Sequence, residues 1–353
     1  MSWRGGERQI SFLALELRQK GIRQAILCAS GSRMATWCQL NEMAHFTYKK
    51  RFSLNPMVAW QISQLDQKHS FTHIHTHDSH SHTFAVMAAT FFHLNKPLIV
   101  HRRVDFPIKN NGLSNWKYNH PSIQAIICVS AFIEHLIRPA IKTKSLLKVI
   151  HSGIDLSVQP SGNGIDLRQE FDIPNDHFII VNLSAIAPHK DYYTFVNTAE
   201  ILLKNGLPAR FLLIGEDGGE RADIQRYIQK KGLEGLLVLT GFRKDVPDIL
   251  AQTDLLLFTS KTEGLGGATM DALKAGVPVV STHVGGVMEV IEDGVTGLVA
   301  PVGDSETLAR HVVKMLSDKD LRTLFVKNGL EKVKQFSKEK NAEKIIAVYQ
   351  GEY

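Results

Sequence analysis

Two acidic residues eight positions apart, Glu263 and Asp271, flank a glycine-rich turn in the second half of the chain. The turn contains Gly264, Gly266 and Gly267, and a helix-like pattern follows it. Glycine lets the backbone approach a ligand closely, and the N-terminus of a helix attracts anions. Carboxylates accept paired hydrogen bonds from neighbouring hydroxyl groups. The pattern therefore suits a site in which one acid holds sugar hydroxyls, the other holds a ribose diol, and the turn meets a phosphate.

A second candidate site lies in the first half, where the segment 72–82 contains five histidines. His73, His75 and His77 alternate along the chain, so they lie on one face of a strand. Imidazoles at this density can bind zinc, and the string is similar to the signature of metallo-β-lactamase-like hydrolases. Asp78 comes one residue early for that signature, and no later carboxylate and histidine set completes a site. We therefore expect no metal site, but a strand end with His77 and Asp78 facing a cleft.

The segment 101–107, with sequence HRRVDFP, places two arginines directly after another apolar stretch. A guanidinium group pairs with a phosphate or carboxylate through two hydrogen bonds. Arg102 and Arg103 are therefore candidates for gripping an anionic ligand. Asp105 is their alternative partner, through ion pairs inside the domain. The sequence leaves both interpretations open.

Short apolar segments alternate with helix-like patterns along the whole chain, which is typical of a doubly wound α/β fold. Such segments, bounded by polar turn residues, indicate buried parallel strands. They are 24–30, 71–77, 96–102 and 124–130 in the first half, and 178–186, 209–215, 236–241, 254–260, 277–283 and 296–301 in the second. A stretch rich in Gly, Ser, Pro and Asp, at 152–166, separates the two sets. The sequence therefore predicts two Rossmann-like domains with parallel sheets.

The front of the first domain departs from the usual order of a Rossmann domain, in which a central strand feeds a glycine-rich turn. Gly5 and Gly6 are preceded only by Met1–Arg4. A central strand needs about five or six residues. We therefore expect that the first strand is missing, or that something else fills its place.

Charge is distributed unevenly over the 353 residues, whose net charge is +6. Residues 1–152 contain 19 lysines and arginines against 7 acids, a balance of +12. The remainder contains 22 against 28, a balance of −6. Such polarity indicates that the first half meets something anionic. The first half lacks the interleaved aromatic residues or reader motif of a nucleic-acid-binding protein.

The composition is that of an ordinary globular protein, with 44% hydrophobic and 22% charged residues. No apolar run approaches the roughly 18 residues of a membrane span, and the start lacks the layout of a signal peptide. Cys28, Cys38 and Cys128 form no CxxC pair, which favours reduced thiols in a cytosolic protein. We expect a cytoplasmic protein, whose basic half would suit peripheral contact with the anionic inner face of the cell membrane.

The stretch 260–301 resembles the donor-binding signature of retaining glycosyltransferases of family 4, which have GT-B architecture. The shared features are the two acids, the glycine-rich turn, the sequence ALKAGVPVV and a later GG followed by Glu289. Other segments resemble the family in the same order, namely 74–85, 126–130, 149–160, 212–219 and 239–260, together with WRGGERQI near the start. The resemblance covers nearly the whole chain and is strongest from about residue 149 onward.

This resemblance implies sugar transfer from a UDP-, GDP- or ADP-linked donor to a glycan or glycolipid, with retention of configuration and without a metal or prosthetic group. Combined with the basic first half, it favours an anionic acceptor such as lipopolysaccharide core or a similar cell-envelope glycan. By motif, catalytic roles are implied for Glu263, Lys190, His101 and Arg103. Donor contacts are implied for Lys190, Gly215, Arg243, Glu263, Leu265, Gly266, Gly267 and Asp271. Acceptor-side positions are Gly5, Gly6, His77 and Arg102.

The domain boundaries follow from the same reading. Residues 1–152 would form the acceptor-binding domain and residues 153–336 the nucleotide-sugar-binding domain. The amphipathic segment 337–353 would form a helix that crosses back to the first domain, as GT-B enzymes often have.

Three departures from the family pattern leave alternatives open. Ala185 stands where the family usually has an arginine, so phosphate neutralisation rests on Lys190, with help from His189 or Arg243. Asp271 is one methylene shorter than the usual glutamate, and the first strand is missing. The chain could therefore be an impaired sugar-nucleotide-binding protein of the same fold. The third alternative is a metal hydrolase built on the histidine cluster.

Overall fold

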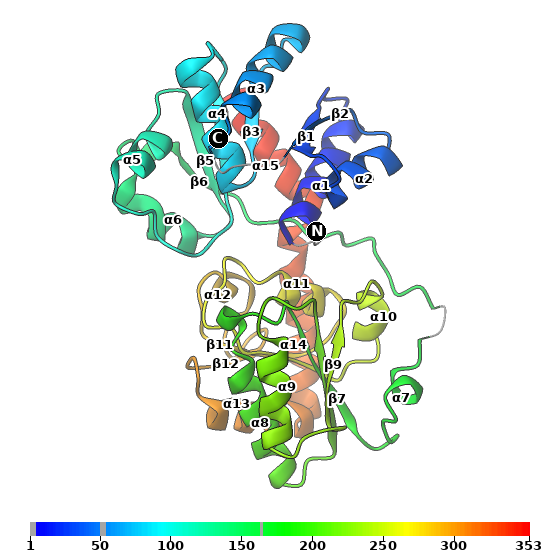
Figure 1. Cartoon of the computed structure of the whole chain (residues 1–353). Coiled ribbons are helices and arrows are strands. Elements are labelled where there is room, and N and C mark those ends of the chain that lie inside the picture. Colours follow the sequence, from blue (N-terminus) through cyan, green and yellow to red (C-terminus); the bar gives the residue numbers. More distant parts are fainter. Residues whose placement is uncertain (1–4, 50–53, 163–164) are drawn as a thin grey trace. The chain divides into compact units, whose positions relative to one another are not determined.

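A computed structural model describes residues 5–49, 54–162 and 165–353 (Figure 1). Contacts divide the chain into two compact units. The first comprises Met1–Gly153 together with Lys338–Tyr353, and the second comprises Ile154–Ser337. Each unit has the alternating strands and helices of a Rossmann-like domain, as the sequence predicted.

In the part of the first unit that the structure describes, six parallel strands form two sheets. One sheet pairs β1 (Ile26–Ala29) with β2 (His45–Tyr48). The other has the order β3-β4-β5-β6, formed by Ile74–Thr76, Leu98–Arg102, Ile123–Cys128 and Leu147–Val149. The helices are α1 (Gly5–Gln19), α2 (Arg33–Leu40), α3 (Pro56–His69), α4 (Ser79–Phe91), α5 (Gly112–Tyr118), α6 (Ala131–Ile137) and α15 (Lys338–Gln350).

The C-terminal helix α15 is part of the core of the first unit. Ala342, Ile345 and Val348 of α15 pack with Leu13 and Leu17 of α1, and the cluster also contains Ile99 of β4. Burial of these aliphatic side chains is the main force that holds the helix there.

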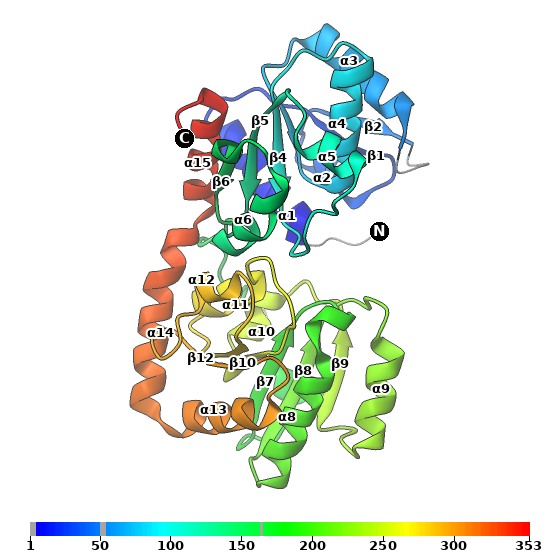
Figure 2. The ribbon, with the colours of Figure 1, turned by 90° about the vertical axis from the view of Figure 1, so that its left-hand side faces the viewer.

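The second unit has one six-stranded parallel sheet of order β12-β11-β10-β7-β8-β9. Its strands are β7 (Phe178–Leu183), β8 (Ala209–Ile214), β9 (Leu237–Gly241), β10 (Leu255–Phe258), β11 (Val279–Thr282) and β12 (Leu298–Ala300). Its helices are α7 (Leu167–Glu170), α8 (Tyr192–Lys204), α9 (Arg221–Lys230), α10 (Val246–Leu250), α11 (Gly267–Lys274), α12 (Val287–Val290), α13 (Ser305–Ser317) and α14 (Lys319–Val333). Figure 2 shows α8 and α9 across one face of this sheet, where their apolar side chains join the core.

The strand order of the second unit reverses between β7 and β10. From β7 the chain proceeds to β8 and β9 on one side, whereas from β10 it proceeds to β11 and β12 on the other. In an open α/β sheet, ligands bind at the carboxyl ends of the strands at such a switch point. The segments that follow β7 and β10 are therefore the ones expected to carry a site.

The described residues contain all ten predicted strands, each shorter than predicted and β5 beginning one residue earlier, together with two that were not predicted, β2 and β6. The sequence HFTY of β2 has no fully buried residue, so it lacks the apolar signal of a central strand. The motif predicted that Gly5 and Gly6 lie in a glycine-rich loop. They lie instead in the first turn of α1. The expected missing strand concerns residues 1–4, which lie outside the described residues.

Candidate functional site

Lys190 and Glu263 meet at the switch point of the second unit. Lys190 ends a short 3-10 turn, Pro188–Lys190, in the segment after β7, and Glu263 follows β10. The Lys190 ammonium donates to the Glu263 carboxylate, and the two side chains are 13% and 18% exposed. Such shielding from water strengthens the interaction of opposite charges. The sequence motif selected both residues but did not predict that they contact each other, and the structure shows this contact.

The glycine-rich turn is held in one conformation by contacts around Gly266. Its φ is +87°, and a Cβ at this position would lie 2.8 Å from Cγ2 of Val287, so only glycine fits without strain. The N–H of Gly286 donates to the Glu263 carbonyl at 3.1 Å, which fixes the start of the turn. Leu265 is buried against the unit. The carbonyl of Gly266 accepts from the Thr269 hydroxyl at 2.7 Å.

Helix α11 begins directly after this turn, at Gly267. The first N–H groups of a helix lack intrahelical partners. Within the described ranges, no acceptor is found for the N–H groups of Leu265, Gly266 and Gly267. The turn therefore presents backbone donors and the positive end of a helix dipole immediately after Glu263.

Asp271 lies inside α11 and lines a cavity of the second unit. The rest of the lining is largely apolar: Val158, Gln159, Pro160, Val246, Pro247, Leu250, Ala251, Lys274 and Ala275. Lys274 donates to the carbonyls of Asp155 and Val158, at 3.2 and 2.9 Å, and so fixes the segment that forms one wall. A carboxylate beside apolar surface suits a ligand that has both hydroxyl groups and a flat ring.

Two further predicted donor contacts are engaged within the chain. The Arg243 guanidinium forms ion pairs with both Asp245 and Glu170, and these bonds raise its pKa above the usual value. The N–H of Gly215 donates to the Gly241 carbonyl at 3.0 Å. A Cβ on Gly215 would lie 1.9 Å from the Ser184 carbonyl oxygen, so close packing accounts for this glycine.

In the first unit, Arg103 joins His77 and His101. Its guanidinium donates to Nδ1 of His77 at 3.2 and 3.3 Å, to Nδ1 of His101 at 3.2 Å, and to the His77 carbonyl at 3.2 Å. Burial lowers the pKa of both histidines well below the usual value, and the nearby positive charge of Arg103 adds to this effect. Burial also lowers the Arg103 pKa, to about 10.

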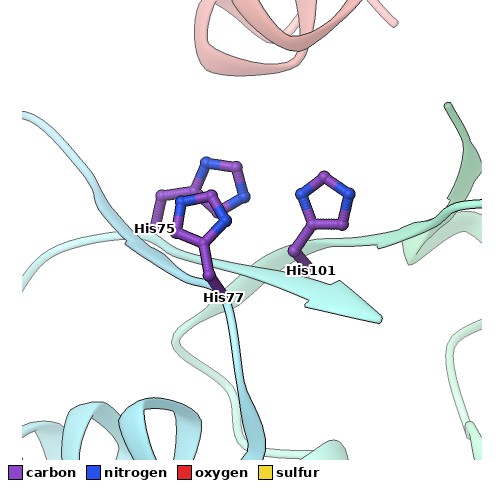
Figure 3. A group of neighbouring side chains, drawn as sticks. All are labelled: His75, His77 and His101. Atoms are coloured by element: carbon purple, nitrogen blue, oxygen red, sulfur yellow. The ribbon is translucent and has the colours of Figure 1, made fainter. Parts of the chain in front are cut away.

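A third histidine, His75, completes this group (Figure 3). One ring nitrogen from each of His75, His77 and His101 lies within 4.8 Å of the others. The rings of His75 and His101 stack with centroids 5.4 Å apart. The sequence predicts no metal site here and does not connect His101 with the other two, because His101 lies on β4 whereas His75 and His77 lie on β3 and directly after it.

Arg102 and Asp78 are used to build the strand ends. Arg102 is 5% exposed and donates to the Tyr118 hydroxyl at 3.0 Å and to the Phe106 carbonyl. These bonds use both terminal nitrogens of the guanidinium, whereas its Nε is buried without a partner in the described chain, and Asp105 is not among its partners there. The Asp78 carboxylate caps α4 by accepting from the N–H groups of His80 and Ser81, at 2.7 and 2.9 Å.

Two protein-family models match the chain. Residues 165–332 match the family "Glycosyl transferases group 1", and residues 3–158 match "Glycosyltransferase Family 4". Among curated proteins, the chain is 29% identical over 215 residues to the N-acetyl-alpha-D-glucosaminyl L-malate synthase of Bacillus anthracis. It is 30% identical over 173 residues to the lipopolysaccharide core biosynthesis glycosyltransferase LpsE of Rhizobium meliloti. These alignments cover 60% and 49% of this chain, but the chain spans only 55% and 49% of those relatives.

Solved structures match over almost the whole length. The crystal structure of Anabaena Alr3699/HepE in complex with UDP and glucose has a TM-score of 0.85 at 21% identity, over 99% of this chain and 96% of that one. The apo form of the lipopolysaccharide outer core galactosyltransferase WaaB has a TM-score of 0.73 at 14% identity, over 99% and 97%. At this identity the likeness concerns the fold, which is GT-B. No helix in the described part of the chain is both long and apolar enough to cross a membrane.

Proposed function

The chain belongs to glycosyltransferase family 4 and has the GT-B fold, and on that premise we propose that it is a retaining, metal-independent glycosyltransferase. It takes a sugar from a nucleotide-sugar and transfers it to a glycan or glycolipid. The observation that carries this proposal is the Lys190–Glu263 pair, which lies at the switch point and is followed at once by the backbone donors of α11.

The two residues of the pair have different tasks. Glu263 accepts hydrogen bonds from hydroxyl groups of the transferred sugar and so positions the anomeric carbon. Lys190 and the N-terminus of α11 stabilise the negative charge that develops on the leaving diphosphate. This positive charge is what makes a bound metal ion unnecessary in the proposal.

The chemical step uses no nucleophile from the protein. The acceptor hydroxyl attacks the anomeric carbon from the face that the diphosphate leaves, which retains the configuration. The bond between the anomeric carbon and the phosphate oxygen breaks as the new glycosidic bond forms. A leaving-group phosphate oxygen takes the hydroxyl proton, so atoms and charge balance. Catalysis then arises from positioning and electrostatic stabilisation.

The nucleotide part of the donor occupies the cavity beside α11. Asp271 accepts from the ribose diol, and the apolar lining, including Val246 and Pro247, contacts the base. Arg243 reaches the diphosphate only by giving up a bond to Asp245 or Glu170, so Lys190 has the larger share of phosphate neutralisation. Binding of UDP and glucose by Anabaena Alr3699/HepE supports a nucleotide-sugar donor.

The acceptor is an anionic cell-envelope glycan or glycolipid that meets the basic first unit. The +12 balance of residues 1–152 supports this choice. The names of LpsE and WaaB, both of lipopolysaccharide core synthesis, support it as well. We assign acceptor contacts to His77 and to the turn of α1 that contains Gly5 and Gly6. His101 and Arg103, to which the motif gave catalytic roles, join this group because Arg103 donates to both histidines, whereas Arg102, which the motif placed on the acceptor side, does not. A cytoplasmic protein with peripheral contact at the membrane would meet such an acceptor.

A panel of UDP-, GDP- and ADP-sugars tests the proposal. A donor that binds raises the melting temperature by mass action, and turnover is followed as release of the nucleoside diphosphate. Binding with turnover supports the transferase. Binding without turnover, with every acceptor class tested, supports the impaired nucleotide-binding protein instead. If no donor binds and none is turned over, both assignments are contradicted.

A further inference from the structure

The histidine cluster of the first unit, formed by His75, His77 and His101, can bind a ligand of another kind than the acceptor assigned to His77 and His101. Three imidazoles, from β3, from the residue after it and from β4, project to the same side and lie beside one another (Figure 3). The parallel register pairs His75 with Ile99 and Thr76 with Val100, so His77 and His101 follow at the same edge of the sheet. The strand register, rather than sequence spacing, therefore builds the cluster.

The nitrogens that face Arg103 are lone-pair acceptors. A guanidinium group has only donors, so Nδ1 of His77 and Nδ1 of His101 must both accept from it. Two lone pairs therefore converge on one cation. Another cation at the position of the guanidinium would meet two of the ligands it needs.

His75 supplies a third nitrogen of the same kind. Its Nδ1 lies 2.7 Å from the Tyr349 hydroxyl, whereas its Nε2 is buried and has no partner in the described chain. A histidine that binds a metal through one ring nitrogen usually has the other held by a hydrogen bond. The Tyr349 hydroxyl provides that second contact for His75.

Arg103 is a cation that this pocket holds incompletely. The carboxylates of Asp78 and Glu7 act on its charge without forming an ion pair with it in the described chain, and its Nε is buried without a partner. A buried charge that lacks full compensation is costly. A smaller cation that used all three imidazoles could replace the guanidinium, whose long side chain can swing out.

We propose that His75, His77 and His101 form a binding site for a borderline transition-metal ion such as Zn²⁺, and that the ion and the Arg103 guanidinium occupy this pocket in competition. A tetrahedral Zn²⁺ ion with bonds of about 2.0–2.1 Å separates its ligand nitrogens by about 3.3 Å. Side-chain rotation must therefore close the cluster from its present limit of 4.8 Å. The fourth position remains for water or an anion.

The site has a consequence for catalysis that rests on the proposed function. Because Arg103 is assigned to the acceptor side, its displacement by the ion lowers sugar transfer. The ion thus inhibits the reaction, and it is not a cofactor that the reaction requires. Binding of the ion can be measured without any transfer, so the two proposals fail separately.

The test is a titration of chelator-treated full-length protein with Zn²⁺, and with Co²⁺ as a spectroscopic probe of tetrahedral nitrogen ligation. We expect one ion per chain for the wild type, binding weakened about tenfold or more in His75→Gln, and binding strengthened about tenfold or more in Arg103→Met. His73→Gln is the matched control, because His73 directly precedes β3 and stacks on Tyr349 but lies outside the cluster. This variant should bind like the wild type.

Three results would overturn the proposal. The first is no stoichiometric binding by either the wild type or Arg103→Met. The second is equal affinity in a His75→Gln protein whose circular dichroism shows that it is folded. The third is unchanged affinity in Arg103→Met, which would remove the competition. If His75→Gln does not fold, X-ray absorption of Zn²⁺ bound to Arg103→Met decides: three imidazole ligands support the site, and fewer contradict it.

Discussion

The ammonium of Lys190 and the carboxylate of Glu263, 73 positions apart in sequence, form a hydrogen-bonded ion pair at the carboxyl ends of β7 and β10. Without ligand, each group satisfies the charge of the other. A sugar and a diphosphate can take over these contacts in turn, since one residue of the pair suits hydroxyl groups and the other suits phosphate. We therefore expect the pair to hold both side chains in place until a donor binds.

Removal of the Lys190 charge should slow the chemical step more than it weakens donor binding. We expect Lys190→Ala to lower kcat by about 10²–10³, because an electrostatic contact made to the leaving group is lost. Steady-state kinetics checks this. Lys204→Ala is the control, since its ion pair with Glu200 lies on the surface, with the lysine 72% exposed, and its loss should leave kcat unchanged. A kcat within twofold of wild type in Lys190→Ala would refute its assigned task.

Asp271 should contribute to nucleotide affinity through the ribose. Asp271→Ala should weaken binding of the ribonucleoside diphosphate by about 10- to 100-fold, the range of a lost hydrogen bond to a charged group. Isothermal titration calorimetry with the ribonucleotide and its deoxyribose analogues checks this. The wild type should discriminate against the analogues, and the variant should not. Equal discrimination in both proteins would place the ribose elsewhere.

Of the glycines in the turn, Gly266 should be the one whose substitution by alanine lowers stability most. Gly266→Ala introduces both a left-handed alanine and a clash with Val287, so it should destabilise the second unit by about 1–3 kcal/mol more than a matched control. Gly303→Ala is that control, because Gly303 has a φ of +82° but nothing within 4 Å of the added Cβ. Urea unfolding gives both values. Equal losses would mean that packing against Val287 is unimportant.

Lys117 should make stability depend on pH in the alkaline range. Burial lowers the Lys117 pKa from 10.5 to about 8. Between these values the unfolded chain binds the proton and the folded chain does not, so stability should rise with pH from about 8 toward 10, by on the order of 1–3 kcal/mol. Lys117→Met should remove this rise, whereas the exposed Lys230→Met should keep it. Urea unfolding over this pH range checks both, and a rise that persists in Lys117→Met would contradict the assignment.

The fold was predictable from the sequence where strands are buried on both faces. The six strands of the second unit are short apolar runs, and each was predicted from its residues alone. Strand β2 was not predicted, because its residues are at most partly buried and its apolar and polar residues do not alternate clearly. A strand is recognised in a sequence by the apolar residues that it buries. A strand in a small two-stranded sheet buries few residues, so its sequence lacks this pattern.

The sequence predicted which residues belong to the site, but it did not predict the contacts between them. The spacing of Glu263 and Asp271 pointed to a ligand site, and Lys190 was selected by motif, but their distances depend on the strand order of the sheet. The pairing of Arg243 with Glu170, 73 positions away, was likewise invisible in the sequence. His101 joins His75 only through the register of β3 and β4. Long-range register and ion pairing are tertiary properties that no local pattern encodes.

The most direct test of the central claim is release of nucleoside diphosphate from the panel of nucleotide-sugars by the wild type and by Glu263→Gln, each with and without EDTA. The charge-neutral variant keeps the size of Glu263 but loses the carboxylate that would hold the sugar. We predict turnover of at least one donor by the wild type, the same rate with EDTA, and a loss of about 10²-fold or more in Glu263→Gln. Turnover that EDTA abolishes, or equal turnover by both proteins, would contradict a metal-independent transferase centred on the Lys190–Glu263 pair.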